Sequence, residues 1–111
     1  MVEGLSFLYA FHELPPGRLP FRRWRWELWH GARLEAAGWR ITRRDAERAL
    51  RAHAARVGHA MFGLPAPPPD AATAGGELLR PGMTVRVDAG AVAFSLVPRH
   101  LERPQALVPA P

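Results

Sequence analysis

The segment from Phe21 to Phe62 constrains the fold most, because a strand-forming stretch runs directly into a helix-forming one. Its first half, FRRWRWELWHGARLEAAGWRI, alternates large apolar residues with charged ones, a pattern typical of half-buried strands. Gly31 can supply the left-handed backbone conformation that a tight turn needs. We therefore expect a β-hairpin with one buried face and one wet face.

The register of this hairpin follows from the position of its loop. A three-residue loop from Trp29 to Gly31 places the apolar residues on one face of the hairpin. On the second face it pairs arginine with glutamate across the strands. The predicted pairs are Leu28 with Ala32, Trp26 with Leu34, Trp24 with Ala36, Glu27 with Arg33 and Arg25 with Glu35. A bulge at residues 36–38 would then turn Trp39 and Ile41 onto the core face.

A long helix is predicted to follow, with Thr42 as its N-cap, Asp45 three residues later, and Gly63 ending it before Leu64-Pro65. Helical spacing gives it an apolar stripe and, on the opposite side, a basic one. The apolar stripe comprises Ala46, Ala49, Leu50, His53, Ala54, Val57, Ala60 and Met61. The basic stripe comprises Arg44, Arg48, Arg51 and His59, with Glu47 able to pair with Arg51.

The remaining segments complete an α+β domain. Residues Leu5 to His12 alternate like a strand and should form the third strand of the hairpin's sheet. We divide the chain into residues 1–63 (sheet plus helix), 64–79 (a Pro/Ala/Gly-rich linker), 80–97 (a C-terminal hairpin) and 98–111 (a Pro-rich tail). The expected architecture is an antiparallel sheet of three or more strands, in the order β-β-β-α and then a hairpin, with the helix packed on one face. The C-terminal hairpin either extends this sheet or forms an arm that docks on a partner.

The charge of the chain is concentrated. All fifteen basic residues are arginine, and residues 18–56 hold eleven of them against four acids, a net charge of +7 within a chain of net charge +5. Such a local excess is typical of proteins that bind polyanions. A GC-rich genome would also explain the absence of lysine, but it would not explain the clustering.

Composition also excludes several classes of function. The chain has no cysteine, so disulfides, thiolate metal sites and a cysteine nucleophile are ruled out. His53 and His59 are six residues apart on the predicted helix and point in different directions, so they cannot share a metal ion. We find no catalytic, phosphate-loop or cofactor motif, no signal peptide and no membrane span. We predict a non-enzymatic, cytoplasmic protein without a cofactor or metal.

Arginine and tryptophan together suggest nucleic acid as the partner, because guanidinium groups bind phosphates and an exposed indole stacks on bases. The alternative for each arginine is an ordinary solvated position with no partner. The candidate nucleic-acid-binding residues are Arg22, Arg23, Arg25, Trp29, Arg33, Arg44, Arg48 and Arg51.

Residues 5–62 are expected to form three antiparallel strands with a helix behind them, and a middle strand carries Arg22-Arg23-Trp24-Arg25-Trp26-Glu27-Leu28-Trp29. This arrangement resembles the sheet-type DNA-binding domains of plant AP2 factors and the arm-binding domains of tyrosine integrases. The resemblance implies that the outer face of the sheet enters the major groove. It would place Arg23, Arg25 and Arg33 at the DNA.

These observations lead to one preferred function and one alternative. We expect a small binding module that engages DNA or RNA through its arginine-rich hairpin and helix face. The alternative is a protein-interaction or assembly subunit that offers its C-terminal hairpin and aromatic N-terminal strand to another chain. The first requires the hairpin and helix arginines to share one continuous surface, and the second requires an exposed apolar patch.

Overall fold

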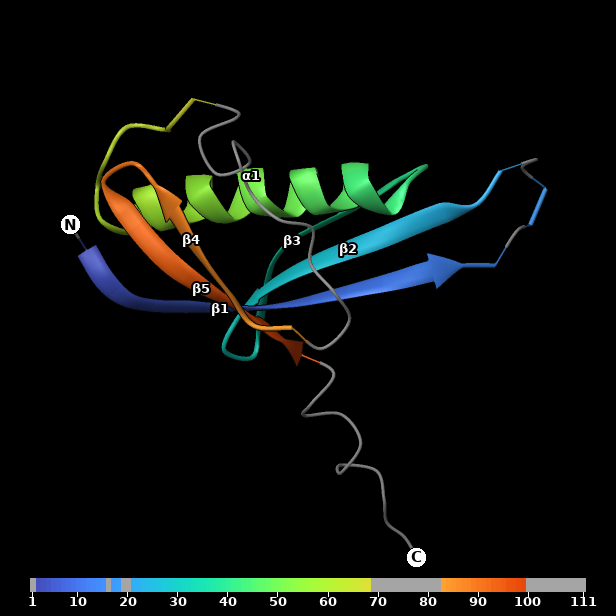
Figure 1. The fold of residues 1–111 in the computed structure, drawn as a ribbon, viewed down its shortest axis with the longest axis horizontal. Coiled ribbons are helices and arrows are strands. Elements are labelled where there is room, and N and C mark those ends of the chain that lie inside the picture. Colours follow the sequence, from blue (N-terminus) through green and yellow to red (C-terminus); the bar gives the residue numbers. More distant parts are fainter. Residues whose placement is uncertain (1, 16, 19–20, 69–82, 100–111) are drawn as a thin grey trace, which may run out of the picture.

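A computed structural model describes residues 2–15, 17–18, 21–68 and 83–99 as one mixed β-sheet with a helix on one face (Figure 1). The predicted linker and tail lie largely outside these residues. In chain order the elements are β1 (Val2–Leu14), β2 (Arg23–His30), β3 (Arg33–Arg40), α1 (Arg43–Met61), β4 (Val85–Ala89) and β5 (Val92–Pro98).

The predicted α+β class is confirmed, and the C-terminal hairpin joins the main sheet. The strand order is β3-β2-β1-β5-β4, and neighbouring strands are antiparallel except β1 and β5, which run parallel. A parallel pair requires a long connection, which the intervening hairpin, helix and linker provide. β1 pairs with β2 from Leu8 to Leu14 and with β5 at Val2 and from Leu5 to Tyr9, so its middle lies inside the sheet. The alternative in which this strand contacts another chain stays a prediction.

The predicted register of the first hairpin is also wrong. His30 pairs with Arg33, so the loop is the two-residue Gly31-Ala32 turn, and Gly31 has a φ of 62°. Glycine in the first loop position with a positive φ is the type II′ arrangement, whose twist matches that of the flanking strands. A register shift follows between Leu28 and Trp29. The predicted bulge at residues 36–38 therefore lies nearer the turn than expected.

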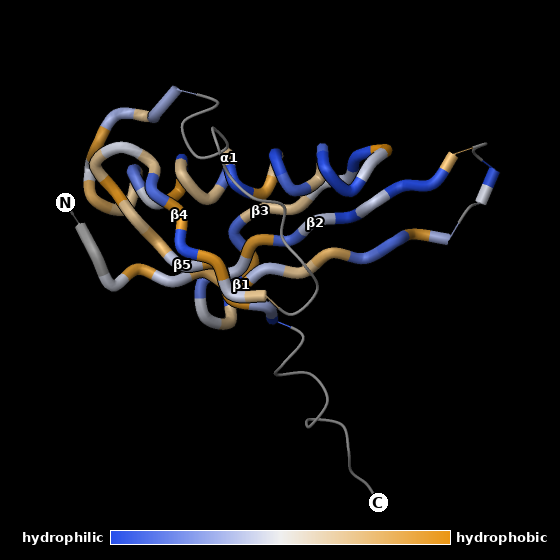
Figure 2. The backbone as a smooth tube through the Cα atoms, in the orientation of Figure 1, coloured by the Kyte–Doolittle hydropathy of each residue, from blue (hydrophilic) through white to orange (hydrophobic). Residues whose placement is uncertain are grey.

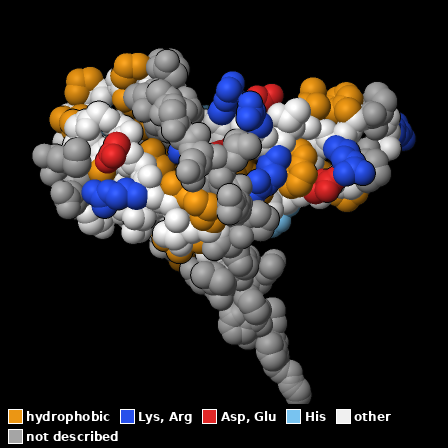
Figure 3. Space-filling model, in the orientation of Figure 1, with side chains coloured by type: hydrophobic (Ala, Val, Ile, Leu, Met, Phe, Trp, Pro, Cys, Tyr) orange, Lys and Arg blue, Asp and Glu red, His pale blue; other side chains and the backbone are white. Residues whose placement is uncertain are grey.

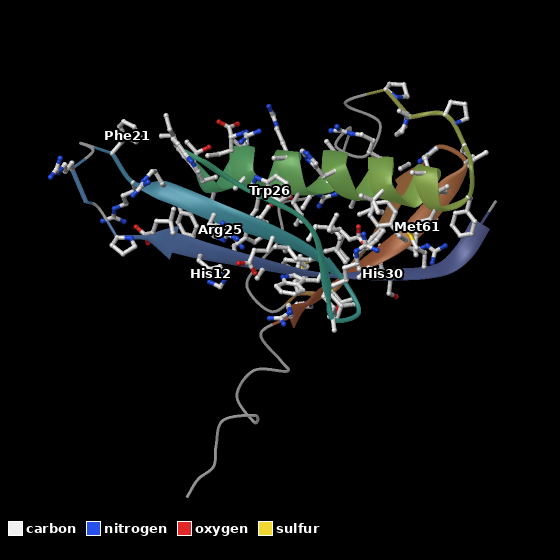
Figure 4. All side chains as sticks on the ribbon, turned by 180° about the vertical axis from the view of Figure 1, so that it is seen from behind. His12, Phe21, Arg25, Trp26, His30 and Met61 are labelled. Atoms are coloured by element: carbon white, nitrogen blue, oxygen red, sulfur yellow. The ribbon has the colours of Figure 1, made fainter. Side chains whose placement is uncertain are left out.

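Trp26 gives a physical reason for the observed register. It lies opposite Gly38, and a Cβ atom added to Gly38 would be 3.0 Å from the Trp26 indole nitrogen. The indole also packs against the His53 ring of α1 in a tilted arrangement, with ring centroids 4.8 Å apart. Trp26 lies between the sheet and α1 (Figure 4), and a side chain at position 38 would crowd its ring.

The core lies between the sheet and α1. Strand residues on the helix side alternate with outward-facing residues, and β5 forms the most continuously hydrophobic strand (Figure 2). The Tyr9 hydroxyl donates a hydrogen bond to the Met83 carbonyl oxygen and so ties β1 to the segment before β4. The largest fully buried core side chains are Phe7, Trp26, Leu28, Leu50, Val92, Phe94 and Leu96.

The predicted ends of α1 are confirmed. The Thr42 side chain accepts a hydrogen bond of 3.1 Å from the Asp45 amide. At the other end Gly63 has a φ of 70°, and the Leu64 amide donates to the His59 carbonyl oxygen over 2.9 Å. Both ends therefore follow from local sequence signals, the N-cap threonine and the left-handed glycine.

The predicted apolar stripe of α1 is right at the start of the helix and wrong at its end. Met61 is 44% exposed and Ala60 is exposed, whereas Gly58 and His59 are buried. A Cβ atom added to Gly58 would contact Leu5 and Val92 at 3.4 Å, so Gly58 allows the helix to approach β1 and β5 closely. The last turns therefore bury a different side from the one that the spacing predicted.

Candidate nucleic-acid interface

The outer face of the sheet, away from α1, carries a polar cluster centred on Glu27 of β2. The Arg25 Nε donates to Glu27 Oε2 over 2.9 Å, and the Trp29 indole donates to Glu27 Oε1 over 3.0 Å. His12 Nε2 of β1 lies 3.7 Å from the same carboxylate. His12 and Arg25 are seen on this side of the sheet in Figure 4. Arg25, a predicted DNA contact, is therefore held by a neighbouring carboxylate.

The environment of Glu27 favours its charged form. Burial is the largest single influence and by itself would raise the pKa of this carboxyl group. The hydrogen bonds from Arg25 and Trp29, together with the nearby His12, outweigh it and lower the pKa below its ordinary value. Glu27 therefore favours its ionised form and pairs with the charge of Arg25.

Trp29, the predicted stacking residue, already has partners on the protein. Its indole N–H is bonded to Glu27, and the Arg99 guanidinium lies 3.8 Å from the centroid of its ring. The sequence did not indicate this second contact, because Arg99 arrives from the far end of β5. A base would have to displace Arg99 to stack on that face of Trp29.

Three further arginines of the hairpin and its approach also have partners. Arg22 lies 3.1 Å from Glu13, and Arg33 lies 3.8 Å from Glu35. The Arg23 guanidinium reaches the Pro15 carbonyl oxygen at 3.4 Å and lies 5.7 Å from the Trp39 ring centroid. Each of these arginines therefore has a partner nearby in the chain or the sheet. The side chains of Arg22 and Arg33 are nevertheless largely exposed to solvent.

Arg51 lies in the interior, which corrects its predicted place on an exposed basic stripe. Its Nε lies 3.1 Å from Glu47 Oε2, and the side chains of Arg51 and Glu47 are only 6% and 5% exposed. His59, assigned to the same stripe, is also buried, and its Nδ1 lies 2.8 Å from the Ala55 carbonyl oxygen. The spacing predicted the pairing of Glu47 with Arg51 correctly, but it could not show that other elements cover the pair.

Arg44 and Arg48, hereafter the helix arginine pair, have a different environment. Both side chains are exposed and one helical turn apart on α1. Within the described part of the chain, neither forms an ion pair or a side-chain hydrogen bond. In Figure 3, arginine side chains (blue) are visible over α1 and over the ends of β1 and β2.

A shallow hollow of about 520 Å³ lies where β3 meets α1. It is lined by Gly38, Trp39, Arg40, Ile41 and Asp45. Trp39 is 46% exposed and Ile41 is 53% exposed, so the prediction that both face the core is wrong. With the observed register Trp39 lies opposite Arg25 and therefore shares the outer face of β3, the edge strand.

Sequence reasoning missed this hollow as a candidate site. A tryptophan next to Gly38 and close to several arginines was a usable signal, but the bulge predicted at residues 36–38 assigned Trp39 to the interior.

No known protein family, curated protein or solved structure matches the chain. The site must therefore be interpreted from its own chemistry. Among the described residues, no group of three His, Asp or Glu side chains is arranged to hold a metal ion. No helix in that part of the chain combines the length and the apolar character needed to cross a membrane.

The two sets of predicted arginines lie in different layers of the molecule. The outer face of β2 carries Arg23 and Arg25, and α1 carries the helix arginine pair on the other side of the sheet. Trp39 connects one set to the other, because Arg23 approaches its ring and the hollow beside it extends to Asp45, the neighbour of Arg44. The continuous surface that nucleic-acid binding requires would therefore run around the β3 edge.

Proposed function

We propose that this protein binds nucleic acid through a basic surface formed by the start of α1 and the adjoining end of β3. The observation that carries the proposal is the environment of the helix arginine pair, which is exposed and has no carboxylate partner in the described part of the chain. Arg22, Arg25, Arg33 and Arg51, by contrast, each lie beside a carboxylate. Unpaired guanidinium groups are the ones that can bind phosphate without first breaking an ion pair.

The surroundings of the helix arginine pair support the same proposal. Arg40 is exposed at the end of β3, and its Nη1 donates to the Trp39 carbonyl oxygen over 2.8 Å. Phosphate near the first turn of α1 would also be favoured by the positive end of the helix dipole. The function is that of a binding module without catalysis, acting in the cytoplasm, and affinity would come mainly from phosphate contacts.

The test is the salt dependence of binding to a labelled duplex and a labelled single strand, measured by fluorescence anisotropy. We expect the logarithm of the association constant to fall linearly with the logarithm of the salt concentration. The double variant Arg44→Ala/Arg48→Ala should bind more weakly and should reduce the slope by roughly 1.4 to 1.8, because each lost phosphate contact removes about 0.7 to 0.9.

A matched control is the double variant Arg22→Ala/Arg33→Ala. It removes the same charge from two side chains that are 77% and 82% exposed but lie beside carboxylates. The control should bind nearly as well as the unmodified protein. Equal weakening by both double variants would mean that binding follows net charge alone, and absence of binding at low salt would refute the proposal.

A second candidate function is assembly with another chain at the β3 edge. It is favoured by three exposed apolar side chains on or next to this strand, Leu34, Trp39 and Ile41. Sedimentation velocity over a range of protein concentrations tests it. A concentration-dependent dimer that dissociates in the Trp39→Ala variant would support assembly.

A further inference from the structure

Building on the proposed function, we propose that the hollow beside β3 receives one unpaired base of a single-stranded nucleic acid, stacked on Trp39. The partner would then be single-stranded DNA or RNA, or an unpaired segment of a folded RNA. The inference rests on the availability of Trp39, the walls of the hollow and the placement of charge around it.

Trp39 is the most accessible aromatic platform among the four tryptophans. Trp26 is 2% exposed in the core, and Trp24 packs against the core. Trp29 has its N–H bonded to Glu27 and the Arg99 guanidinium on its ring. Trp39 is 46% exposed, and its closest cation contact is Arg23 at 5.7 Å from the ring centroid. Base stacking needs an open aromatic face, and Trp39 meets that need best.

The shape of the hollow suits a flat apolar group. Trp39 and Ile41 both line the hollow and are both exposed, so they give it apolar walls. The volume of about 520 Å³ lies within the range of small-ligand sites, roughly 300–1,000 Å³. Since the hollow is open at the surface, a base can enter from a strand that continues along the molecule on both sides.

The charges around the hollow indicate which part of a nucleotide it takes. Asp45 contributes a carboxylate to the lining, which disfavours a phosphate group inside. Arg40 lines the same hollow, and Arg44 directly precedes Asp45 in α1. An uncharged base therefore fits inside the hollow, while its flanking phosphates would meet Arg40 and Arg44.

A duplex cannot use the hollow in this way. Its bases are paired and stacked on each other, and their faces are not available to a side chain at the protein surface. Single strands present free base faces, and stacking on an aromatic residue tolerates any base. The hollow should therefore add affinity for single strands over that supplied by phosphate contacts alone.

The experiment compares Trp39→Ala and Trp39→Phe with the unmodified protein. The probes are a labelled oligothymidylate of about twelve nucleotides, within the usual site sizes, and a labelled duplex of the same length. Trp39→Ala should weaken binding to the single strand by roughly 5- to 150-fold, the range for loss of one stacked base, and change duplex binding less than about twofold. Trp39→Phe should retain most of the single-strand affinity, because it keeps an aromatic face.

The control is Leu34→Ala, which removes another exposed apolar side chain, 42% accessible, from the same strand. It should leave binding to both probes unchanged. Circular dichroism should give the same spectrum for all variants, since both substituted side chains lie at the surface.

The outcomes separate this inference from the function on which it rests. Trp39→Ala could reduce the affinity for both probes equally, or for neither, while Arg44→Ala/Arg48→Ala still lowers affinity. In that case the proposed base site is wrong, and the phosphate-binding surface remains. If neither probe binds at low salt, both proposals fail. If Trp39→Ala instead dissociates a dimer seen by sedimentation, the hollow belongs to an interface between two copies, and the base site is overturned.

Discussion

At the scale of single residues, the partners of each charged side chain matter more than its charge. Arg25 and Arg44 are both arginines in the basic half of the chain, yet Arg25 is bonded to Glu27 and Arg44 is exposed beside the hollow. Binding a phosphate through Arg25 would require breaking a charge-assisted hydrogen bond. The same distinction removes Arg51 from the candidate interface, because its guanidinium is buried against Glu47.

Glu27→Gln should lower the free energy of unfolding by about 1 kcal/mol at neutral pH, because the amide has one acceptor oxygen and no charge. It can accept from Arg25 or from Trp29 but not from both, and the remaining hydrogen bond is weaker. The pKa of Glu27 is lower in the folded protein than its ordinary value of 4.5. The folded state therefore binds fewer protons than the unfolded state, so the stabilisation is complete above pH 4.5 and is lost as the pH falls through the folded-state pKa.

Urea unfolding from neutral to acidic pH measures this difference. The stability advantage of the unmodified protein over Glu27→Gln should shrink below about pH 4.5. Glu35→Gln is the control, because Glu35 lies 3.8 Å from an arginine that is 82% exposed. A stability difference for Glu27→Gln that does not change with pH would contradict the assigned role of its charge.

At the scale of elements, close packing of Trp26 on Gly38 couples β2, β3 and α1. Edge strand β3 contributes little bulk to the core, since its helix-side positions opposite Leu28 and Trp26 are Ala36 and Gly38. The large indole of Trp26 fills that space and reaches His53 of the helix. One glycine therefore determines how closely α1 can approach the hairpin.

Gly38→Ala tests this packing. The added methyl group would meet the Trp26 ring at 3.0–3.2 Å, so we expect a loss of about 1–3 kcal/mol in the free energy of unfolding, the usual cost of overpacking. Chemical denaturation of a double-mutant cycle with Trp26→Phe isolates the clash. In the Trp26→Phe background, the same alanine should be nearly neutral or stabilising. An equal loss in both backgrounds would show that Trp26 is not the cause.

At the scale of the whole molecule, the five strands and the helix share one core. The C-terminal hairpin supplies Val92, Phe94 and Leu96, all fully buried, and β5 pairs with the central strand β1. Phe7 of β1 packs edge-to-face on Phe94, with ring centroids 5.5 Å apart. The sheet-plus-helix unit assigned to residues 1–63 would therefore expose a large apolar surface if it stood by itself.

A fragment of residues 1–63 should consequently fail to unfold cooperatively, whereas residues 1–99 should keep a cooperative transition. Thermal unfolding followed by circular dichroism and tryptophan fluorescence compares the two fragments. The longer fragment controls for truncation itself, because it retains β4 and β5. A sharp transition in the shorter fragment would mean that the hairpin adds to a core that is already sufficient.

The sequence by itself determined the features that depend on neighbours along the chain. Thr42 and Gly63 mark the ends of α1, alternation marks the strands, and Gly31 marks the reversal of the first hairpin. These signals act over a few residues, so the α+β class and the order of elements could be predicted from them.

Tertiary structure alone decided the strand order, the hairpin register and the state of each arginine. The parallel pairing of β1 with β5 joins segments more than eighty residues apart, and no local pattern encodes it. The register depends on fitting Trp26 against Gly38 and His53 together, a packing condition in three dimensions. Trp39 is exposed and Arg51 is buried for the same reason: what covers a side chain is set by elements distant in sequence.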